Sequence, residues 1–359
     1  MLLKALVNRK NNSKLSIKLN SINKNKLFNR QDKKILKNTL YSEDFERITC
    51  SFYKYFKLTN VAEFRNNLYL KWSDFQILGR TYIASEGINA QISIPKHNFD
   101  KFDNHLRSIS VLNDVKIKMG LEDNGKSFEK LIVRIKEKIV ADGLKISNFD
   151  HTNIGKHLSP MEFNKAMESE NSIVVDVRNF YESEVGRFDG AITTDSETFR
   201  ESLPKIKNIL ENNKKNKILL YCTGGIRCEK ASAYLKHHDF SDVNQLDGGI
   251  INYAHKVKEK KIENKFKGKN FVFDKRLGEK ITEDILSNCY LCNKPSNTHT
   301  DCSFQPCHTL FIQCEDCSKK YEGCCSKECH EFSKFPKELH NKKWNLVKHN
   351  KSGKMMRPK

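Results

Sequence analysis

The chain has 359 residues, 38% of them hydrophobic, which is enough for two or three domains with hydrophobic cores. It contains no apolar run near the roughly 20 residues that cross a bilayer, so we expect a soluble protein rather than a membrane protein. The net charge of +20 indicates a polyanionic partner, most simply a nucleic acid, although part of the excess reflects a Lys-rich composition along the whole chain.

Residues 1–46 are expected to form a basic N-terminal extension. The first 31 residues contain no acidic residue and are rich in Lys, Arg, Asn and Ser. That composition is typical of a basic tail and also of a mitochondrial presequence. We favour the tail, and therefore a cytoplasmic location, with a mitochondrial location as the alternative.

Residues 47–147 show a regular alternation of strand and helix patterns. Their order resembles a ferredoxin-like α+β sandwich. The segment 86–89, Glu-Gly-Ile-Asn, has turn chemistry and is predicted to be a hairpin loop; a basic sheet that holds RNA is a compatible functional alternative. The periodicity predicts strands over 48–56, 77–84, 88–94, 115–119 and 131–140, and helices over 61–75 and 98–108.

A polar, irregular linker is expected over residues 148–164, followed by an α/β domain over 165–262. A helix starting at 161–167 and buried strands at 172–177 and 243–246 fit this domain. The alternation of strands and helices favours a parallel sheet flanked by helices, with its reactive loops at the carboxyl ends of the strands.

One loop of this domain carries the chemistry. An apolar strand over 218–220 ends at Cys222, and a helix is expected to start near Cys228. Loop N–H groups, the helix N-terminus and the positive charge of Arg227 all favour the thiolate form of Cys222, although a buried structural cysteine is the simpler interpretation of an arbitrary thiol. The loop comprises Cys222, Thr223, Gly224, Gly225, Ile226, Arg227 and Cys228.

This loop resembles the active-site loop of rhodanese domains, which implies a persulfide carried on Cys222. Four residues separate Cys222 from Arg227, and this small ring suits a sulfur atom better than a phosphoryl group. Cys228 either resolves a persulfide or disulfide on Cys222 or is only a small residue at the helix start; both interpretations stay open.

The stretch 178–191 resembles the first rhodanese signature. The resemblance implies that Asp176, Arg178 and Glu182 brace the loops around the site, and we expect a structural ion-pair set that performs no chemistry. Arg187 stands where the family usually has histidine, so no role of that histidine is carried over. The segment 247–253 resembles the closing signature, with Tyr253 at the usual aromatic position.

Residues 263–284 form a Lys-dense connector in which Phe266, Phe271 and Phe273 are interleaved. Such a segment can clamp single-stranded RNA by phosphate contact and base stacking. The interpretation we favour is a solvated connector whose phenylalanines pack on the rhodanese domain.

Nine of the twelve cysteines lie between Cys289 and Cys329, within a module expected over 285–332 and followed by a basic tail over 333–359. Two C-x-x-C pairs are a strong zinc signal, with His299 and His308 as further possible ligands. One or two structural zinc ions are predicted; an iron–sulfur cluster is the alternative and disulfides come last. The proposed ligand sets are Cys289, Cys292, Cys314 and Cys317, and Cys302, Cys307, Cys325 and Cys329.

Five motifs in order resemble the bacterial tRNA uridine hydroxylase family. The resemblance implies oxygen-dependent hydroxylation of the wobble uridine of tRNA to 5-hydroxyuridine, with the rhodanese cysteine essential. They are Phe-Tyr-Lys-Tyr-Phe at 52–56, Glu-Gly-Ile-Asn at 86–89, Gly-Lys-Ser-Phe at 125–128, the loop at 222–230 and Cys-Cys-Ser at 324–326.

The residues alone support less than this resemblance implies. They indicate a reactive thiolate, a metal module and a basic surface, and no dinucleotide-binding glycine fingerprint or other nucleotide cofactor site is evident. A sulfurtransferase that passes sulfur from Cys222 to tRNA or another acceptor is the alternative, and a non-catalytic RNA or protein scaffold is the third possibility. As a hydroxylase, Cys222 would form a transient adduct or persulfide near the uridine ring.

Overall fold

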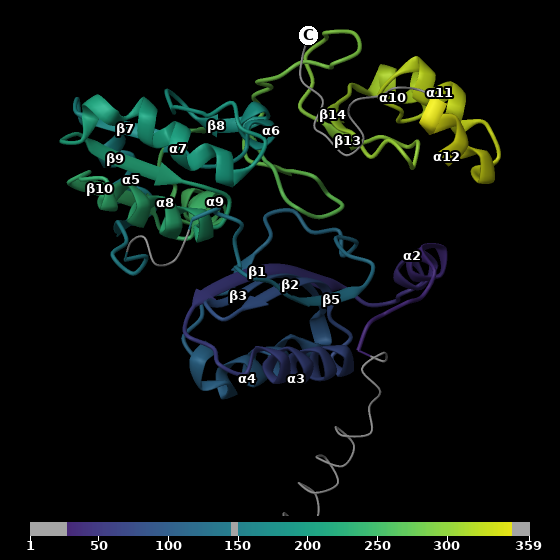
Figure 1. The fold of residues 1–359 in the computed structure, drawn as a ribbon, viewed down its shortest axis with the longest axis horizontal. Helices are drawn as coiled ribbons and strands as arrows, with labels where there is room; N and C mark the ends of the chain where they lie inside the picture. The colour runs from purple at the N-terminus through teal and green to yellow at the C-terminus, as the bar shows by residue number, and fades with distance from the viewer. Residues whose placement is uncertain (1–26, 145–149, 347–359) are drawn as a thin grey trace, which may run out of the picture. The chain divides into compact units, whose positions relative to one another are not determined.

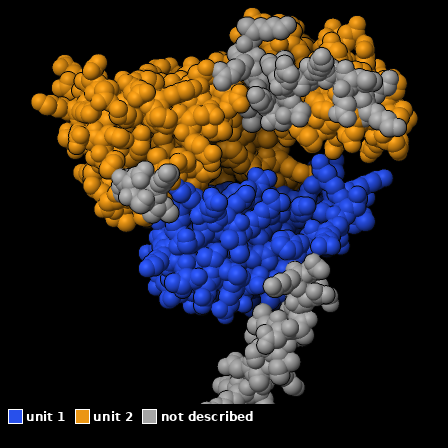
Figure 2. All heavy atoms as spheres, in the orientation of Figure 1, with its two compact units in different colours: residues 1–49, 54–115, 128–139 blue, residues 50–53, 116–127, 140–359 orange. Residues whose placement is uncertain are grey.

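The computed structural model describes residues 27–144 and 150–346. They fall into two compact units, coloured in Figure 2. The described residues within 1–49, 54–115 and 128–139 form the first unit, and those within 50–53, 116–127 and 140–359 form the second. Within the described ranges, no helix has the length and apolar character needed to span a membrane. The composition that suggests a tail or a presequence falls largely on residues 1–26, outside the described residues.

A βαββαββ order builds the N-terminal domain, and this alternation confirms the ferredoxin-like prediction. The strand order is β4-β1-β3-β2-β5, and α3 and α4 cover one face of the strands labelled in Figure 1. Helix α2 lies within the predicted N-terminal extension. The elements are α2 Lys33–Tyr41, β1 Arg47–Tyr55, α3 Val61–Asp74, β2 Leu78–Ala84, β3 Gly87–Pro95, η2 Lys96–Asn98, α4 Phe99–Ser108, η3 Ser110–Leu112, β4 Lys118–Met119 and β5 Leu131–Ile135.

Aromatic packing joins the two helices of this domain. Leu68 and Trp72 lie one turn apart on α3 and are both buried. The Trp72 ring meets the Phe102 ring of α4 at a centroid distance of 5.8 Å, and neither residue is exposed. This contact fixes the helix pair over the sheet.

The Glu-Gly-Ile-Asn motif forms the predicted hairpin turn. Ala84 of β2 pairs with Gly87 of β3, and Glu86 occupies the turn between them. The Glu86 carboxylate accepts a hydrogen bond from the Ile139 amide at 2.9 Å. The motif therefore stabilises the chain segment that leaves the domain, while its RNA-binding alternative stays a prediction.

A four-stranded parallel sheet in the order β6-β10-β9-β7 forms the centre of the second unit (Figure 1). Alternate residues of β9 enter opposite hydrophobic clusters: Ile218 and Leu220 pack with α7 and α8, and Leu219 and Tyr221 with α5 and α9. The elements are β6 Lys156–Leu158, α5 Pro160–Met167, β7 Ser172–Asp176, α6 Phe180–Glu184, β8 Gly186–Phe188, α7 Phe199–Ile209, η5 Glu211–Asn213, β9 Lys217–Tyr221, α8 Ile226–His237, β10 Asp242–Leu246 and α9 Gly249–Lys260.

The expectation of an irregular linker over 148–164 is wrong for part of that range. Residues 156–158 form the edge strand β6, which pairs in parallel with β10 from Lys156 to Leu158. Two of its three side chains are exposed, so the strand depends on backbone hydrogen bonds and shows no apolar pattern. Helix α5 then begins at Pro160, behind a capping box between Ser159 and Glu162.

The Lys-dense connector is part of a sheet, so the expectation of a solvated segment is wrong. Strand β11 (Phe266–Asn270) pairs antiparallel with β8 and with β12 (Glu279–Lys280). Its side chains alternate between buried and half-buried positions. The expected packing of Phe266 on the rhodanese core is confirmed, because its ring lies 5.4 Å from the Phe188 ring.

The C-terminal module is a β-hairpin followed by helices. Helix α12 lies in the segment predicted to be a tail. The elements are β13 His299–Asp301, β14 Leu310–Ile312, α10 Glu315–Tyr321, α11 Lys327–Ser333 and α12 Lys337–Leu346.

Candidate active site and metal centres

The loop after β9 connects a buried strand directly to a helix. Tyr221 ends β9, and α8 begins at Ile226, two residues earlier than expected. Gly225 caps the helix with φ of 99°, a left-handed conformation that favours glycine. This tight turn directs backbone N–H groups at the start of α8 toward the Cys222 side chain.

The Cys222 thiol is buried and held as a thiolate. The Gly225 amide donates a hydrogen bond to Cys222 Sγ at 3.1 Å. Burial opposes ionisation, but the Cys228 thiol, the charge of Arg227 and the amides of Arg227 and Gly225 together lower the pKa of Cys222 to about 5, against 9.0 for an ordinary thiol. Cys222 is therefore ionised at neutral pH.

Arg227 is fixed by a carboxylate from another element. Its guanidinium makes a two-pronged ion pair with Glu182 of α6, with Nη1–Oε1 and Nη2–Oε2 distances of 2.5 and 2.8 Å. The Thr223 hydroxyl adds a hydrogen bond to Glu182 Oε2 at 3.3 Å. Because Glu182 is fully buried, the arginine that stabilises the thiolate has little freedom to move away.

The three supporting residues take part in two separate ion pairs, one between Asp176 and Arg178 and one between Glu182 and Arg227. Asp176 and Arg178 form their own fully buried ion pair, at 2.6 Å between Oδ2 and Nη2. Arg178 also donates to the Gly186 carbonyl oxygen at 2.6 Å, which ties the end of β7 to β8. Asp176 and Arg178 brace the scaffold, whereas Glu182 acts directly on the loop arginine.

A second helix N-terminus supports the loop from behind. The amides of Ile250 and Ile251 at the start of α9 donate to the carbonyl oxygens of Cys222 and Thr223, at 3.0 and 3.2 Å. At Gly249, whose φ is 67°, an added Cβ would lie 2.5 Å from the Cys222 carbonyl oxygen. The closing Gly-Gly segment is thus needed for this close approach.

The second loop thiol stays protonated. Cys228 is fully buried, and burial together with the neighbouring Cys222 thiolate raises its pKa well above the usual range. It stabilises the anion as a hydrogen-bond donor, while its role as a resolving thiol stays a prediction.

Three family models match the chain in succession: the UPF0176 acylphosphatase like domain at 47–139, the Rhodanese-like domain at 159–256 and the Rhodanase C-terminal model at 267–330. A protein of Leptospira interrogans named tRNA uridine(34) hydroxylase is 55% identical, over 88% of this chain and 86% of that protein. A protein of the same name from Photorhabdus laumondii is 45% identical, over 86% of this chain and 88% of that protein. Another from Yersinia enterocolitica is 47% identical, over 87% of this chain and 89% of that protein. The chain belongs to the tRNA uridine(34) hydroxylase family.

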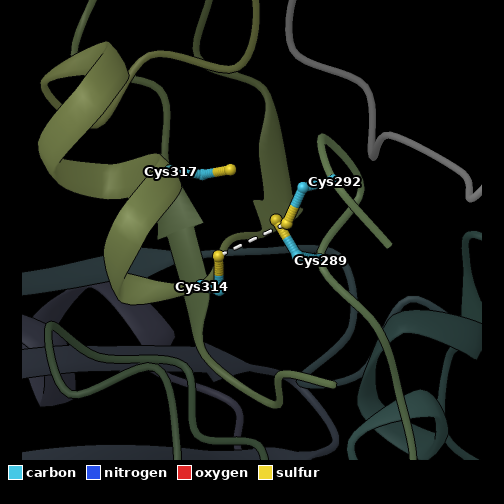
Figure 3. A group of neighbouring side chains, drawn as sticks. All are labelled: Cys289, Cys292, Cys314 and Cys317. Atoms are coloured by element: carbon cyan, nitrogen blue, oxygen red, sulfur yellow. Dashed lines mark hydrogen bonds between the residues drawn. The ribbon is translucent and has the colours of Figure 1, made fainter. Parts of the chain in front are cut away.

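In this family member, eight cysteines of the C-terminal module gather into two groups of four. The sulfur atoms within each group all lie within 4.8 Å of one another. We call Cys289, Cys292, Cys314 and Cys317 the outer cluster, because Cys292 is exposed and Cys314 half-buried (Figure 3). We call Cys302, Cys307, Cys325 and Cys329 the inner cluster, because all four are buried.

Both clusters fit a tetrahedral metal ion. Zinc–sulfur bonds of about 2.3 Å place neighbouring sulfurs about 3.8 Å apart around a tetrahedron. The outer cluster has a Cys292–Cys314 sulfur distance of 3.5 Å, and the inner cluster has distances of 3.6 Å for Cys307–Cys325 and 3.7 Å for Cys325–Cys329. These are the two ligand sets proposed from the sequence.

Neither possible histidine ligand belongs to the two groups of cysteines. His299 is buried, and this burial lowers its pKa to about 4. It packs edge-on against the Phe271 ring at 5.0 Å, so it is a core residue.

Three polar residues next to the Cys222 loop, Tyr53, His157 and Glu229, were not predicted from the sequence to belong to the site. The Tyr53 hydroxyl donates to Glu229 Oε1 at 2.9 Å, and it lies 2.9 Å from where a Cβ on Gly225 would be. His157 Nε2 reaches the same Glu229 oxygen at 3.0 Å. Tyr53 belongs to the 52–56 motif, but it lies 176 positions before Glu229 in the chain, so no local pattern could pair them.

Proposed function

We propose that this chain hydroxylates the uridine at position 34 of tRNA, with molecular oxygen as co-substrate. One oxygen atom enters the base, and the other leaves as water after taking up two electrons and two protons from an external reductant. The observation that carries the proposal is the shared name of relatives that match along nearly the whole chain, including the rhodanese loop. The net charge of +20 suits a tRNA substrate, because lysines and arginines contact phosphates. A tRNA substrate and reduced cysteines also favour the cytoplasm as the site of action.

Cys222 is the residue we propose to act on the base. A thiolate is the nucleophilic form of cysteine, and the low pKa keeps this form populated at neutral pH. Arg227 and the Gly225 amide are placed to stabilise negative charge that develops at the loop. Asp176 and Arg178 position the scaffold and take no part in the chemistry.

The two clusters are proposed to hold structural zinc. Four thiolates complete a tetrahedral coordination shell, as in structural rather than catalytic zinc sites. The ions would stabilise the C-terminal module, whose strands are only three residues long.

Nucleoside analysis tests the function. A bacterial strain that lacks its own 5-hydroxyuridine-forming activity is complemented with the wild type, with Cys222→Ser or with Cys50→Ser, and the tRNA nucleosides are measured by mass spectrometry. Cys50 is a matched control because it is a buried cysteine of β1, outside the loop and both clusters. We expect 5-hydroxyuridine with the wild type and with Cys50→Ser, and none with Cys222→Ser.

Two other results of this complementation experiment would indicate a different function. Appearance of a thiouridine that depends on Cys222 would establish a sulfurtransferase. Full complementation by Cys222→Ser would indicate a non-catalytic scaffold. Growth under isotopically labelled molecular oxygen tests the co-substrate, since the label must appear in the new hydroxyl group.

A further inference from the structure

One phenylalanine of the segment after β11 is exposed, although its neighbours are buried. Phe266 and Phe271 have exposed fractions of 0% and 3%, whereas Phe273 is 42% exposed. A single exposed aromatic is common on protein surfaces and needs no explanation by itself. Its surroundings decide whether it has a role.

Phe273 lies against the candidate active site. Its ring centroid is 5.8 Å from the guanidinium carbon of Arg227. Arg227 is held by Glu182 and belongs to the same loop as Cys222. The exposed ring is therefore next to the loop that carries the reactive sulfur.

The Phe273 ring packs against buried aromatic residues. Phe271 meets Phe273 edge-on at 5.2 Å, and Tyr181 of α6 meets Phe271 at 5.2 Å. This support keeps the Phe273 ring in place at little entropic cost when a ligand binds. A rigid exposed ring beside a charged group is typical of surfaces that stack a planar ligand.

The loop itself leaves space for a ligand. A Cβ added to Gly224 would meet no described atom within 4 Å. Lys275, two residues after Phe273, is also exposed and brings positive charge to the same segment. An aromatic platform with a nearby lysine suits an unpaired nucleotide, which presents a planar base and a phosphate.

We propose that Phe273 is the stacking platform for the target uridine, and so positions its base at the Cys222 loop. The inference rests on the proposed function, because it takes the ligand to be an unpaired base of RNA. It adds a positioning residue that lies outside the loop, in the segment between β11 and β12.

A double-mutant cycle tests this contact. Wild type and Phe273→Ala are titrated with an anticodon stem-loop RNA that carries either uridine or an abasic nucleotide at position 34. On the uridine RNA, we expect Phe273→Ala to weaken binding about 5- to 150-fold, the range of a lost base–aromatic stack. On the abasic RNA, the two proteins should bind within about twofold of each other, since no base is present to stack.

Further variants separate stacking from packing. Phe273→Trp should keep wild-type binding, and Phe273→Leu, which is apolar but not planar, should behave like Phe273→Ala. Phe335→Ala is the matched control, because Phe335 is 39% exposed in the C-terminal module and should leave uridine RNA binding unchanged. An unchanged pH titration of the Cys222 thiolate in Phe273→Ala shows that the loop is intact.

The outcomes distinguish this inference from the proposed function. Equal losses on the two RNAs, no loss on the uridine RNA, or wild-type binding by Phe273→Leu overturns the stacking role even when the enzyme forms 5-hydroxyuridine. A wild type that binds the RNA without forming 5-hydroxyuridine contradicts the proposed function, while the binding cycle still measures the contact. A wild type that does not bind the RNA overturns both.

Discussion

Replacing Arg227 by glutamine tests whether its charge keeps Cys222 ionised. The pKa of Cys222 is about 5 instead of 9.0, a difference worth on the order of 5 kcal/mol at about 1.36 kcal/mol per pH unit. The Cys228 thiol, the Arg227 charge and two backbone amides share this stabilisation and also offset the burial. An opposite charge within about 4–6 Å typically accounts for about one to three pH units. Arg227→Gln should therefore raise the pKa of Cys222 to about 6–8.

The assay is the ultraviolet absorbance of the thiolate as a function of pH, measured for each protein and for the same protein carrying Cys222→Ser. Subtraction removes the contributions of all the other cysteines. At pH 7 the ionised fraction of Cys222 should fall from about 99% in the wild type to about 10–90% in Arg227→Gln.

Glu182→Gln is the control for a general disturbance of the loop. It retains a hydrogen-bond acceptor for Arg227 but removes the negative charge that compensates the guanidinium. The pKa of Cys222 should then stay near 5 or fall. A midpoint near 5 in Arg227→Gln, or an equal rise in both variants, would refute the electrostatic reasoning.

The same ionisation predicts how stability depends on pH. The pKa of Cys222 is lower in the folded than in the unfolded protein. The thiolate therefore makes its full contribution to stability at pH values above the unfolded pKa of about 9, and this contribution is lost as the pH falls through the folded pKa of about 5. The difference in unfolding free energy between the wild type and Cys222→Ser should therefore narrow between about pH 9 and pH 5.

Three further predictions concern the scaffold. Gly249→Ala should abolish 5-hydroxyuridine formation, because the added Cβ would lie 2.5 Å from the Cys222 carbonyl oxygen. Gly190→Ala is the control: Gly190 also has a positive φ, 69°, but an added Cβ would meet no atom within 4 Å, so this variant should only lower the melting temperature. Equal 5-hydroxyuridine formation by the two variants would contradict this prediction. Asp176→Asn leaves the buried Arg178 without a charged partner and should cost about 3–5 kcal/mol in urea unfolding; a loss below about 1 kcal/mol would be inconsistent with the pair. A chelator should expose the outer cluster to thiol-labelling mass spectrometry before the inner cluster, and the reverse order would contradict the burial difference.

The sequence was informative wherever the determinants are local. Ile218, Leu219 and Leu220 form a short apolar run before a Gly-Gly turn, which is a complete signal for a strand, a loop and a helix start. Each C-x-x-C pair likewise places two thiolates on one turn of chain. The loop geometry and the outer cluster follow from such signals, whereas the inner cluster contains no C-x-x-C pair and its grouping has no comparable local signal.

The sequence was uninformative where partners are distant or where a strand carries no apolar pattern. Glu182 pairs with Arg227 across 45 residues, and its short helix α6 has no periodicity to indicate which side faces the loop. Strand β6 pairs with β10 through its backbone and through the His157 ring, which lies 2.6 Å from Gln245 Nε2, and its polar residues are typical of a linker. The segment after β11 buries Phe271 and exposes Phe273, a difference that depends on which tertiary neighbours cover each ring.

The other cysteines of this chain differ from Cys222 in ways that support our proposal that Cys222 is the reactive one. Each of the eight cysteines in the two clusters can bind a metal ion together with three others, and a thiolate bound to a structural metal ion is not free to react. Burial raises the pKa of Cys50, and burial with a neighbouring thiolate raises that of Cys228, so both stay protonated. Cys324 is fully buried next to the inner cluster. Cys222 is equally buried, yet it is ionised because an arginine, a thiol and two amides converge on its sulfur, and the chemistry of a free thiolate is therefore assigned to Cys222.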